Sequence, residues 1–303
     1  MEKRLEDGCE VKAVTVQKTG GPKQGISCRF PGDNHAVVLY PDEYRNLMKS
    51  GADIHDIAGY LAGQAKEKRN ALPDLPTTAE EFRKRLYIQV VNADASREVL
   101  KKAVYDSWED VAAVARCRVA SDKEGAASFM VTEENVGVFQ MTKGEIMEQA
   151  YKNTAAQEFC LKSMNDTMRE LMVSQGLSEG LIADIIPEEE DYMYVLTNKE
   201  KMNGANAIVC PEVLKKAYED LGEPYYVLPS STHEVLLVKE SKGLKPEEMK
   251  EMVHEVNMSD VRPEELLSFK VFHYDGKKLS AVKEDVQKVS ETAEKVKKGI
   301  VIR

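Results

Sequence analysis

The chain has 303 residues, of which 42 are Lys or Arg and 52 are Asp or Glu, so its formal net charge is −10. This acidic balance argues against nucleic-acid binding and against an anionic membrane surface, because both need clustered basic residues. No apolar run approaches the roughly 20 residues that a membrane span requires, and the first residues contain no apolar signal sequence. The length is sufficient for a large core in one domain or in two to three smaller ones.

The five cysteines are an odd number and include no C-x-x-C pair. This pattern argues against a disulfide framework and against a cysteine-rich zinc site. We therefore expect reduced, mostly buried thiols in a cytoplasmic protein.

The first predicted segment, residues 1–72, contains alternating strands followed by helices. Alternation of Val14 and Val16 with polar residues predicts a strand at 11–18, and a Gly-Gly-Pro turn separates it from strands at 26–30 and 36–40. Pro41 is typical of the start of a helix, here through Met48. A second helix is predicted by apolar residues at helical spacing on one face: Ile54, Ile57, Ala58, Leu61 and Ala65.

The middle predicted segment, residues 78–186, opens with a helix capping box at Thr78 to Glu81. A strand at 87–92 and a hairpin of strands 111–119 and 127–132 follow. A second capping box at Thr142 to Glu145 begins another helix. A longer helix then carries four apolar residues on one side: Met164, Met168, Leu171 and Met172. We expect this side to pack in the core, and the alternative is an adaptable binding face.

The third predicted segment, residues 192–280, follows an acidic linker at 187–191. A strand at 192–196 leads through a polar loop to a helix that begins at Pro211 and ends at Gly222. Strands 225–228 and 235–238 form a hairpin, a helix begins at Pro246, and the turn residues Asp275 and Gly276 join two last strands.

The tail, residues 281–303, is predicted to be an amphipathic helix. Its apolar residues recur at alternating steps of four and three, as in a short coiled-coil seam: Val282, Val286, Val289, Ala293 and Val296. Val286, Val289, Ala293 and Val296 could pair with a second copy in a homodimer, or the helix could dock on its own chain. We expect docking on its own chain, because short terminal helices usually dock in this way.

The motifs of common catalytic and cofactor sites are absent. The sequence contains no phosphate-binding G-x-x-x-x-G-K-[ST], no G-x-G-x-x-G and no G-x-S-x-G. The two His-Glu pairs lack the second histidine of a zinc protease, since Leu237 and Met258 stand at that position. We therefore predict no metal site and no cofactor.

Two polar loops between apolar strands are the candidate sites. The loop 229–234 combines hydroxyl, imidazole and carboxylate groups, which suit nucleophilic or acid/base chemistry, in Ser230, Ser231, His233 and Glu234. Ser and Pro are also ordinary turn residues, so we expect a structural turn, with catalysis as the alternative. The loop 197–204 offers ligand contacts through Asn198, Lys199 and Asn203, although a solvated loop is the simpler expectation. The two loops would form one site if they lay at the same sheet end.

One further set of residues is distinctive in combination: it comprises 192–198, 204–205, 211–214, 226–238, 253–257, 261–267 and 273–275, and upstream 38–40, Tyr44, Gly51 and 87–92. Through these residues the chain resembles an uncharacterised family of anaerobic Gram-positive bacteria. The order of elements is more distantly similar to a second such family. Both are domains of unknown function, so the resemblance implies a bacterial cytoplasmic α+β protein and transfers no activity.

We therefore predict an α+β protein with antiparallel or mixed sheets, helices packed on one face, and a C-terminal amphipathic helix. The missing catalytic motifs favour a non-enzymatic binding or adaptor protein that recognises a protein or a small molecule. The alternative is an enzyme or small-ligand-binding domain that uses the loops 197–204 and 229–234.

Overall fold

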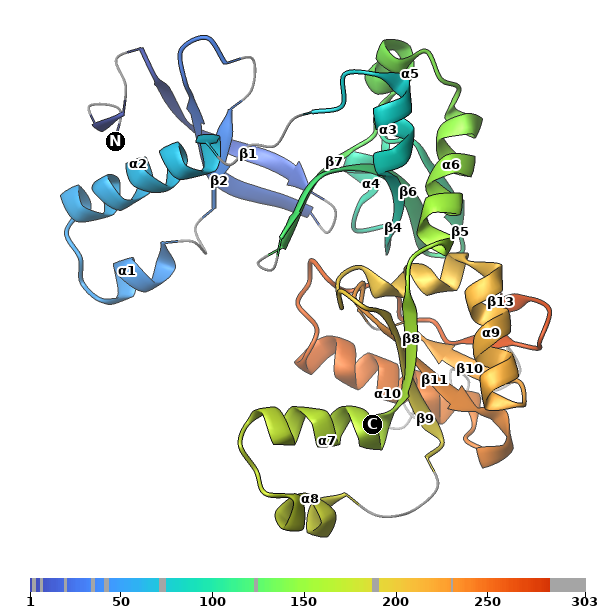
Figure 1. The fold of residues 1–303 in the computed structure, drawn as a ribbon. Coiled ribbons are helices and arrows are strands. Elements are labelled where there is room, and N and C mark those ends of the chain that lie inside the picture. Colours follow the sequence, from blue (N-terminus) through green and yellow to red (C-terminus); the bar gives the residue numbers. More distant parts are fainter. Residues whose placement is uncertain are drawn as a thin grey trace, which may run out of the picture.

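The computed structural model describes residues 1, 4–5, 8–18, 21–33, 36–40, 44–70, 75–122, 125–186, 191–229 and 231–283. Their strands form three sheets, and every strand pairing in them is antiparallel (Figure 1). The α+β class with antiparallel sheets is confirmed. The tail residues Val286, Val289, Ala293 and Val296 lie outside the described residues, so the helix and the dimer seam stay predictions.

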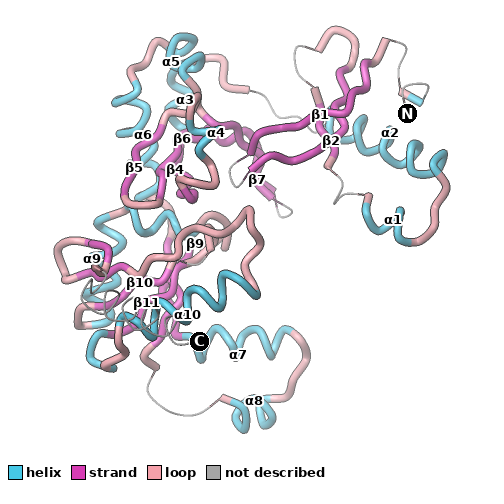
Figure 2. The backbone as a smooth tube through the Cα atoms, turned by 180° about the vertical axis from the view of Figure 1, so that it is seen from behind, coloured by secondary structure: helices cyan, strands magenta, loops and turns pink. Residues whose placement is uncertain are grey.

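The N-terminal unit is a three-stranded sheet with one long helix against it. Its elements are β1 (Glu10–Lys18), β2 (Gly21–Arg29), β3 (Val37–Leu39), α1 (Arg45–Lys49) and α2 (Ile54–Asn70). The three strands and the second helix are confirmed. Helix α2 buries Leu61, Ala62 and Ala65 against a separate small core that includes Phe30 and Leu39. This unit lies beside the other two in both views (Figure 2).

The second unit contains a four-stranded sheet, called here the middle sheet, in which the long strand β6 pairs with β4, β5 and β7. Its elements are α3 (Ala79–Arg85), β4 (Leu86–Asn92), α4 (Arg97–Leu100), β5 (Tyr105–Trp108), β6 (Val111–Asp122), β7 (Gly125–Met130), α5 (Glu133–Phe139) and α6 (Lys143–Ala155). The predicted hairpin is β6–β7. Thr142 and Glu145 form the predicted capping box of α6, and Thr78 accepts the backbone N–H of Glu81 at the start of α3.

The third unit contains a six-stranded sheet, called here the C-terminal sheet, with the order β13-β12-β10-β11-β9-β8. Its elements are β8 (Phe159–Ser163), α7 (Met164–Ser174), α8 (Glu179–Ile185), β9 (Met193–Asn198), η3 (Gly204–Val209), α9 (Pro211–Leu221), β10 (Tyr225–Leu228), β11 (Val235–Lys239), η4 (Glu240–Lys242), α10 (Pro246–Ser259), β12 (Phe272–Tyr274) and β13 (Leu279–Ala281). Strand β8 pairs with β9, so this sheet takes its edge strand from the predicted middle segment.

Helices lie on both faces of the C-terminal sheet, whereas we expected them on one. Met249 and Val253 of α10 pack with Leu228 and Val238 on one face. On the other face, Val227 and Leu237 belong to the main core together with α9. The alternation of side chains along β10 and β11 therefore gives both faces an apolar surface, and both are covered.

The expected core position of the methionine-bearing helix is wrong. Helix α7 contains no buried residue, and Met168 is 39% and Leu171 58% exposed. Helices α7 and α8 project from the edge of the C-terminal sheet next to β8 (Figure 1). Helical spacing of apolar residues predicts an amphipathic helix, but it does not determine what covers the apolar face.

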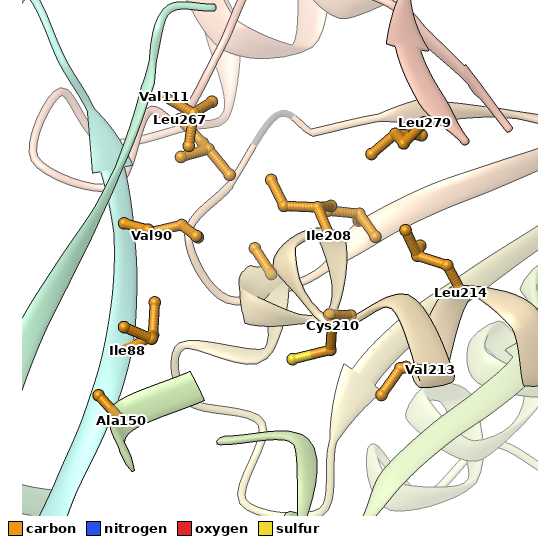
Figure 3. Packing of buried hydrophobic residues seen from close by; sticks show 14 of the residues in the cluster. Ile88, Val90, Val111, Ala150, Ile208, Cys210, Val213, Leu214, Leu267 and Leu279 are labelled. Carbon is orange, nitrogen blue, oxygen red and sulfur yellow. The ribbon is translucent and has the colours of Figure 1, made fainter. Parts of the chain in front are cut away.

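The middle and C-terminal sheets share one hydrophobic core along the outer edge of β4. Ile88 and Val90 of β4 face Ile208 and Cys210, in and directly after η3 (Figure 3). The outward backbone groups of β4 are satisfied by side chains instead of a further strand. Asn206 accepts the Val90 N–H at 2.9 Å and donates to the Ile88 carbonyl.

Helix α6 supplies the remaining partners of this edge. Thr154 Oγ1 accepts the Ile88 N–H at 2.8 Å, and Asn153 donates to the Leu86 carbonyl at 2.8 Å. An unpaired edge strand is costly when buried, because its backbone groups cannot reach water. These side chains make it possible to bury the edge between the two units.

Replacing Asn206 with alanine should lower the free energy of unfolding by about 2–4 kcal/mol, because two buried backbone groups lose their partners. Urea unfolding followed by circular dichroism measures this change. Gln175→Ala, which alters an exposed side chain, is the matched control and should change stability by less than about 0.5 kcal/mol. Equal effects of the two substitutions would contradict the role given to Asn206.

Candidate functional site

The two predicted polar loops lie against each other. Strands β9 and β11 are antiparallel neighbours in which Leu196 pairs with Val235, so the loop after β9 and the loop before β11 emerge at the same sheet end. The Asn203 N–H donates to His233 Nδ1 at 3.3 Å, and Thr197 Oγ1 donates to the His233 carbonyl at 2.8 Å. Loops 197–204 and 229–234 therefore form one continuous polar cluster.

Both ring nitrogens of His233 have partners within this cluster. Because Nδ1 accepts the backbone N–H of Asn203, the proton of a neutral ring lies on Nε2, which is 3.2 Å from Oε1 of Glu265. Arg262 donates to the same carboxylate. Burial would raise the pKa of the Glu265 carboxyl, but Arg262 and His233 outweigh it and hold the pKa below its ordinary value.

Among the described residues, the serine and glutamate candidates of loop 229–234, Ser231 and Glu234, form no hydrogen bond with the ring nitrogens of His233. The hydroxyl of Ser231 is buried and accepts the backbone N–H of His233 at 2.9 Å, which is the contact of a turn. Ser230 lies outside the described residues. Glu265, from a distant loop, and not Glu234, is the carboxylate that contacts the ring.

The ligand-binding candidates of loop 197–204 have structural partners. The side chain of Asn198 is buried and bonds both the N–H and the carbonyl of Met202, which closes the loop. Asn203 has a left-handed backbone, and its Oδ1 accepts a hydrogen bond from Gln89 at 3.0 Å. Lys199 is exposed and forms an ion pair with Glu158.

Gly204 allows the two loops to approach this closely. A Cβ at this position would lie 2.5 Å from the carbonyl oxygen of His233 and 2.7 Å from the backbone nitrogen of Asn198, and it would also clash with Thr197. Two of these neighbours are backbone atoms, which cannot move aside. Only glycine at this position is therefore compatible with the close approach of the two loops.

Cysteine chemistry has no support in the main core. Burial raises the pKa of Cys117 to about 11 and that of Cys210 to about 12. Both thiols stay protonated at neutral pH, so neither is an activated nucleophile. Within the described ranges there is no group of three or more histidine, cysteine, aspartate or glutamate side chains that could hold a metal ion.

The sequence did not point to an open groove between the two larger units. It has a volume of about 760 Å³ and lies between the turn after β5, helix α10 and strand β13. Its walls contain the aromatic residues Trp108, His254 and Phe269 and four lysines. The sequence signal was dispersed, because these residues come from four separate stretches of the chain between positions 108 and 283.

The ring contacts fix the aromatic residues of this groove. The ring of Trp108 lies 4.6 Å from that of Phe272, and His254 lies 5.7 Å from Phe269, measured between centroids. Phe269 is nevertheless 42% exposed. Lys270 forms an ion pair of 2.8 Å with Glu109, and this hydrogen bond raises the pKa of the lysine.

Gly204→Ala should destabilise the fold by at least about 2 kcal/mol, because the added methyl group meets backbone atoms that cannot relax. The matched control is Gly63→Ala in the middle of α2, where a Cβ would meet nothing within 4 Å. That substitution should stabilise the protein by about 0.5–1 kcal/mol. Thermal unfolding of both variants measures the difference, and a shift of the same sign in both would refute the close approach.

Glu265→Gln should remove a pH-dependent part of the stability. The folded-state pKa of Glu265 lies below its ordinary value of 4.5, so its contribution is complete above that value and is lost as the pH falls through the folded pKa. The difference in unfolding free energy between wild type and variant should therefore shrink between pH 7 and pH 3. Urea titrations across this range measure it, and a constant difference would contradict the ion pair.

Comparison with known proteins identifies the family of the chain, and that family has no assigned activity. Neither the curated proteins nor the solved structures contain a significant match to the chain. No helix in the described part of the chain is long and apolar enough to cross a membrane. Residues 1–276, which are most of the chain, match the model of one protein family. The chain belongs to DUF5688, a family of unknown function.

Proposed function

We propose that this protein is a non-enzymatic binding protein, and that the groove between its two larger units receives an acidic segment of a partner protein. The observation that supports this proposal best is the combination of aromatic walls and lysines in one groove of a chain with net charge −10. Among the described residues of the polar loops, the Ser231 hydroxyl is engaged in a turn contact with the His233 backbone, which gives the enzyme alternative less support.

The aromatic residues supply the apolar part of the recognition. Trp108 and Phe269 are fixed by ring contacts, so they offer contact area without a large loss of side-chain entropy on binding. Phe269 exposes its ring to solvent in the absence of a partner. Exposed aromatic residues in a concave surface are typical of binding hot spots.

The charges of the groove select the partner. Lys250, Lys270, Lys278 and Lys283 contribute to its walls, and Glu109 is the one carboxylate among the described lining residues. Since Glu109 pairs with Lys270, a positive excess remains from the other three lysines. Glutamate or aspartate side chains of a partner would complement it and steer the encounter.

Strand β13 suggests how a segment of polypeptide would lie. It is the terminal strand of the C-terminal sheet, and among the described strands it pairs only with β12. Its residues line the groove. An extended partner segment can hydrogen-bond to such an edge while alternate side chains enter the apolar floor.

The proposal includes a location of the protein in the bacterial cytoplasm. All five cysteines are free thiols, as expected in a reducing compartment, and three of them are buried. The family resemblance stated for the sequence is consistent with this location.

The single tryptophan of the chain, Trp108, lines the groove and reports on its occupancy. An eight-residue peptide in which glutamate alternates with phenylalanine and leucine should give a saturable change in tryptophan fluorescence. The same peptide with lysine in place of glutamate should not. Phe269→Ala and Lys250→Glu should each weaken the acidic peptide about tenfold.

Lys215→Glu, at an exposed position of α9, is the matched control and should leave the affinity unchanged. Circular dichroism establishes that the variants are folded. The proposal is refuted if the two peptides bind equally, if neither binds, or if Lys215→Glu weakens binding as much as Lys250→Glu does.

A further inference from the structure

A second cavity, separate from the groove, lies where the ends of α3 and α6 meet the middle sheet. Its volume is about 340 Å³, near the lower limit of ligand pockets. Lys84 and Arg85 reach it from the end of α3, and Arg118 from β6. No carboxylate is among its described lining residues. Three cationic side chains therefore line one small cavity.

Helix stabilisation accounts for only part of this cluster. Basic residues in the last turn of a helix interact favourably with its dipole, which explains Lys84 and Arg85. It does not explain Arg118, which belongs to a strand of the middle sheet. The convergence of charges from two elements therefore requires another reason.

Arg118 is held in a fixed position. Its guanidinium carbon lies 5.2 Å from the centroid of the Tyr87 ring, and the Tyr87 hydroxyl donates to Ser128 Oγ at 2.9 Å. Arg116 also donates to Ser128, so the platform under Arg118 is itself anchored. A guanidinium stacked on a ring keeps its N–H groups available in its own plane, where they match the oxygens of a phosphate group.

The other polar groups of the cavity allow the same chemistry. Lys84 pairs with Glu80 at 2.7 Å, but both side chains are more than 70% exposed, so this ion pair is weak and can be exchanged for a ligand. Gln157 Oε1 lies 3.4 Å from Asn198 Nδ2, from which it accepts, so the amino group of Gln157 is the part that can donate elsewhere. The lining thus offers donors for an anion.

We infer that this cavity binds a phosphate-bearing small molecule, with Arg118 and Lys84 contacting the phosphate oxygens. The volume admits a phosphorylated metabolite, and the confined basic area does not provide the extended surface that a nucleic acid needs. This site is distinct from the groove proposed for the partner protein, since the two share no lining residue.

Isothermal titration of the full chain with sodium pyrophosphate at low ionic strength tests the inference. Wild type should bind saturably with one site, and added sodium chloride should weaken binding by screening. Arg118→Gln should weaken it about tenfold or more, because a charge-assisted bidentate contact is lost. Arg118→Lys should also weaken it, because lysine keeps the charge and loses the fork.

Two further variants keep the test decisive. Lys84→Gln changes an exposed side chain that is compatible with folding and should weaken binding severalfold, so the inference stays testable if Arg118→Gln is unstable. Lys215→Gln removes one charge on α9, outside the cavity, and should bind as wild type does. The inference is overturned if wild type shows no saturable binding, if Lys84→Gln and the Arg118 variants that fold bind as wild type does, or if Lys215→Gln is equally impaired.

Discussion

The hydrogen bonds along the outer edge of β4 are the interaction on which the rest of this structure depends. A strand edge presents backbone donors and acceptors that must be paired if they are buried. The carboxamide of Asn206 accepts one of these hydrogen bonds and donates the other, so it replaces a peptide group of a neighbouring strand. Through this contact the middle sheet and the C-terminal sheet share one core without forming one continuous sheet.

The position of η3 follows from the same contact. Asn206 holds the short helix against β4. The preceding residues, Asn203 and Gly204, consequently lie close to His233. His233, Thr197 and Asn203 therefore hold the two loops together, and Asn198 closes the loop 197–204. These contacts give the polar loops a structural role.

The two larger units also form two open surfaces: the groove is lined by elements of both units, and the smaller cavity lies where α3 and α6 meet the middle sheet. The groove combines aromatic residues with lysines in its walls, while the smaller cavity combines cationic side chains with amide groups. Both concentrate positive charge in a chain whose total is strongly negative. Local positive potential in an acidic protein attracts anionic ligands selectively, because most of the remaining surface repels them.

The sequence alone determined the elements that depend on local signals. Pro211 and Gly222 bound α9 as predicted, and the carboxylate of Asp275 accepts the N–H groups of Lys277 and Lys278 in the predicted turn. These features were predictable because the contacts join residues a few positions apart. The sequence also brought both polar loops to attention, although not their contact.

The tertiary structure decided which surfaces these elements present. Apolar spacing identified α7, but only the packing of the sheets determined that Met168 and Leu171 stay exposed. The partner of His233 is Glu265 and the partner of Val90 is Asn206, and no local pattern relates residues so far apart in the sequence. Such pairs depend on how whole units are arranged, because each contact joins residues that only the tertiary fold brings together.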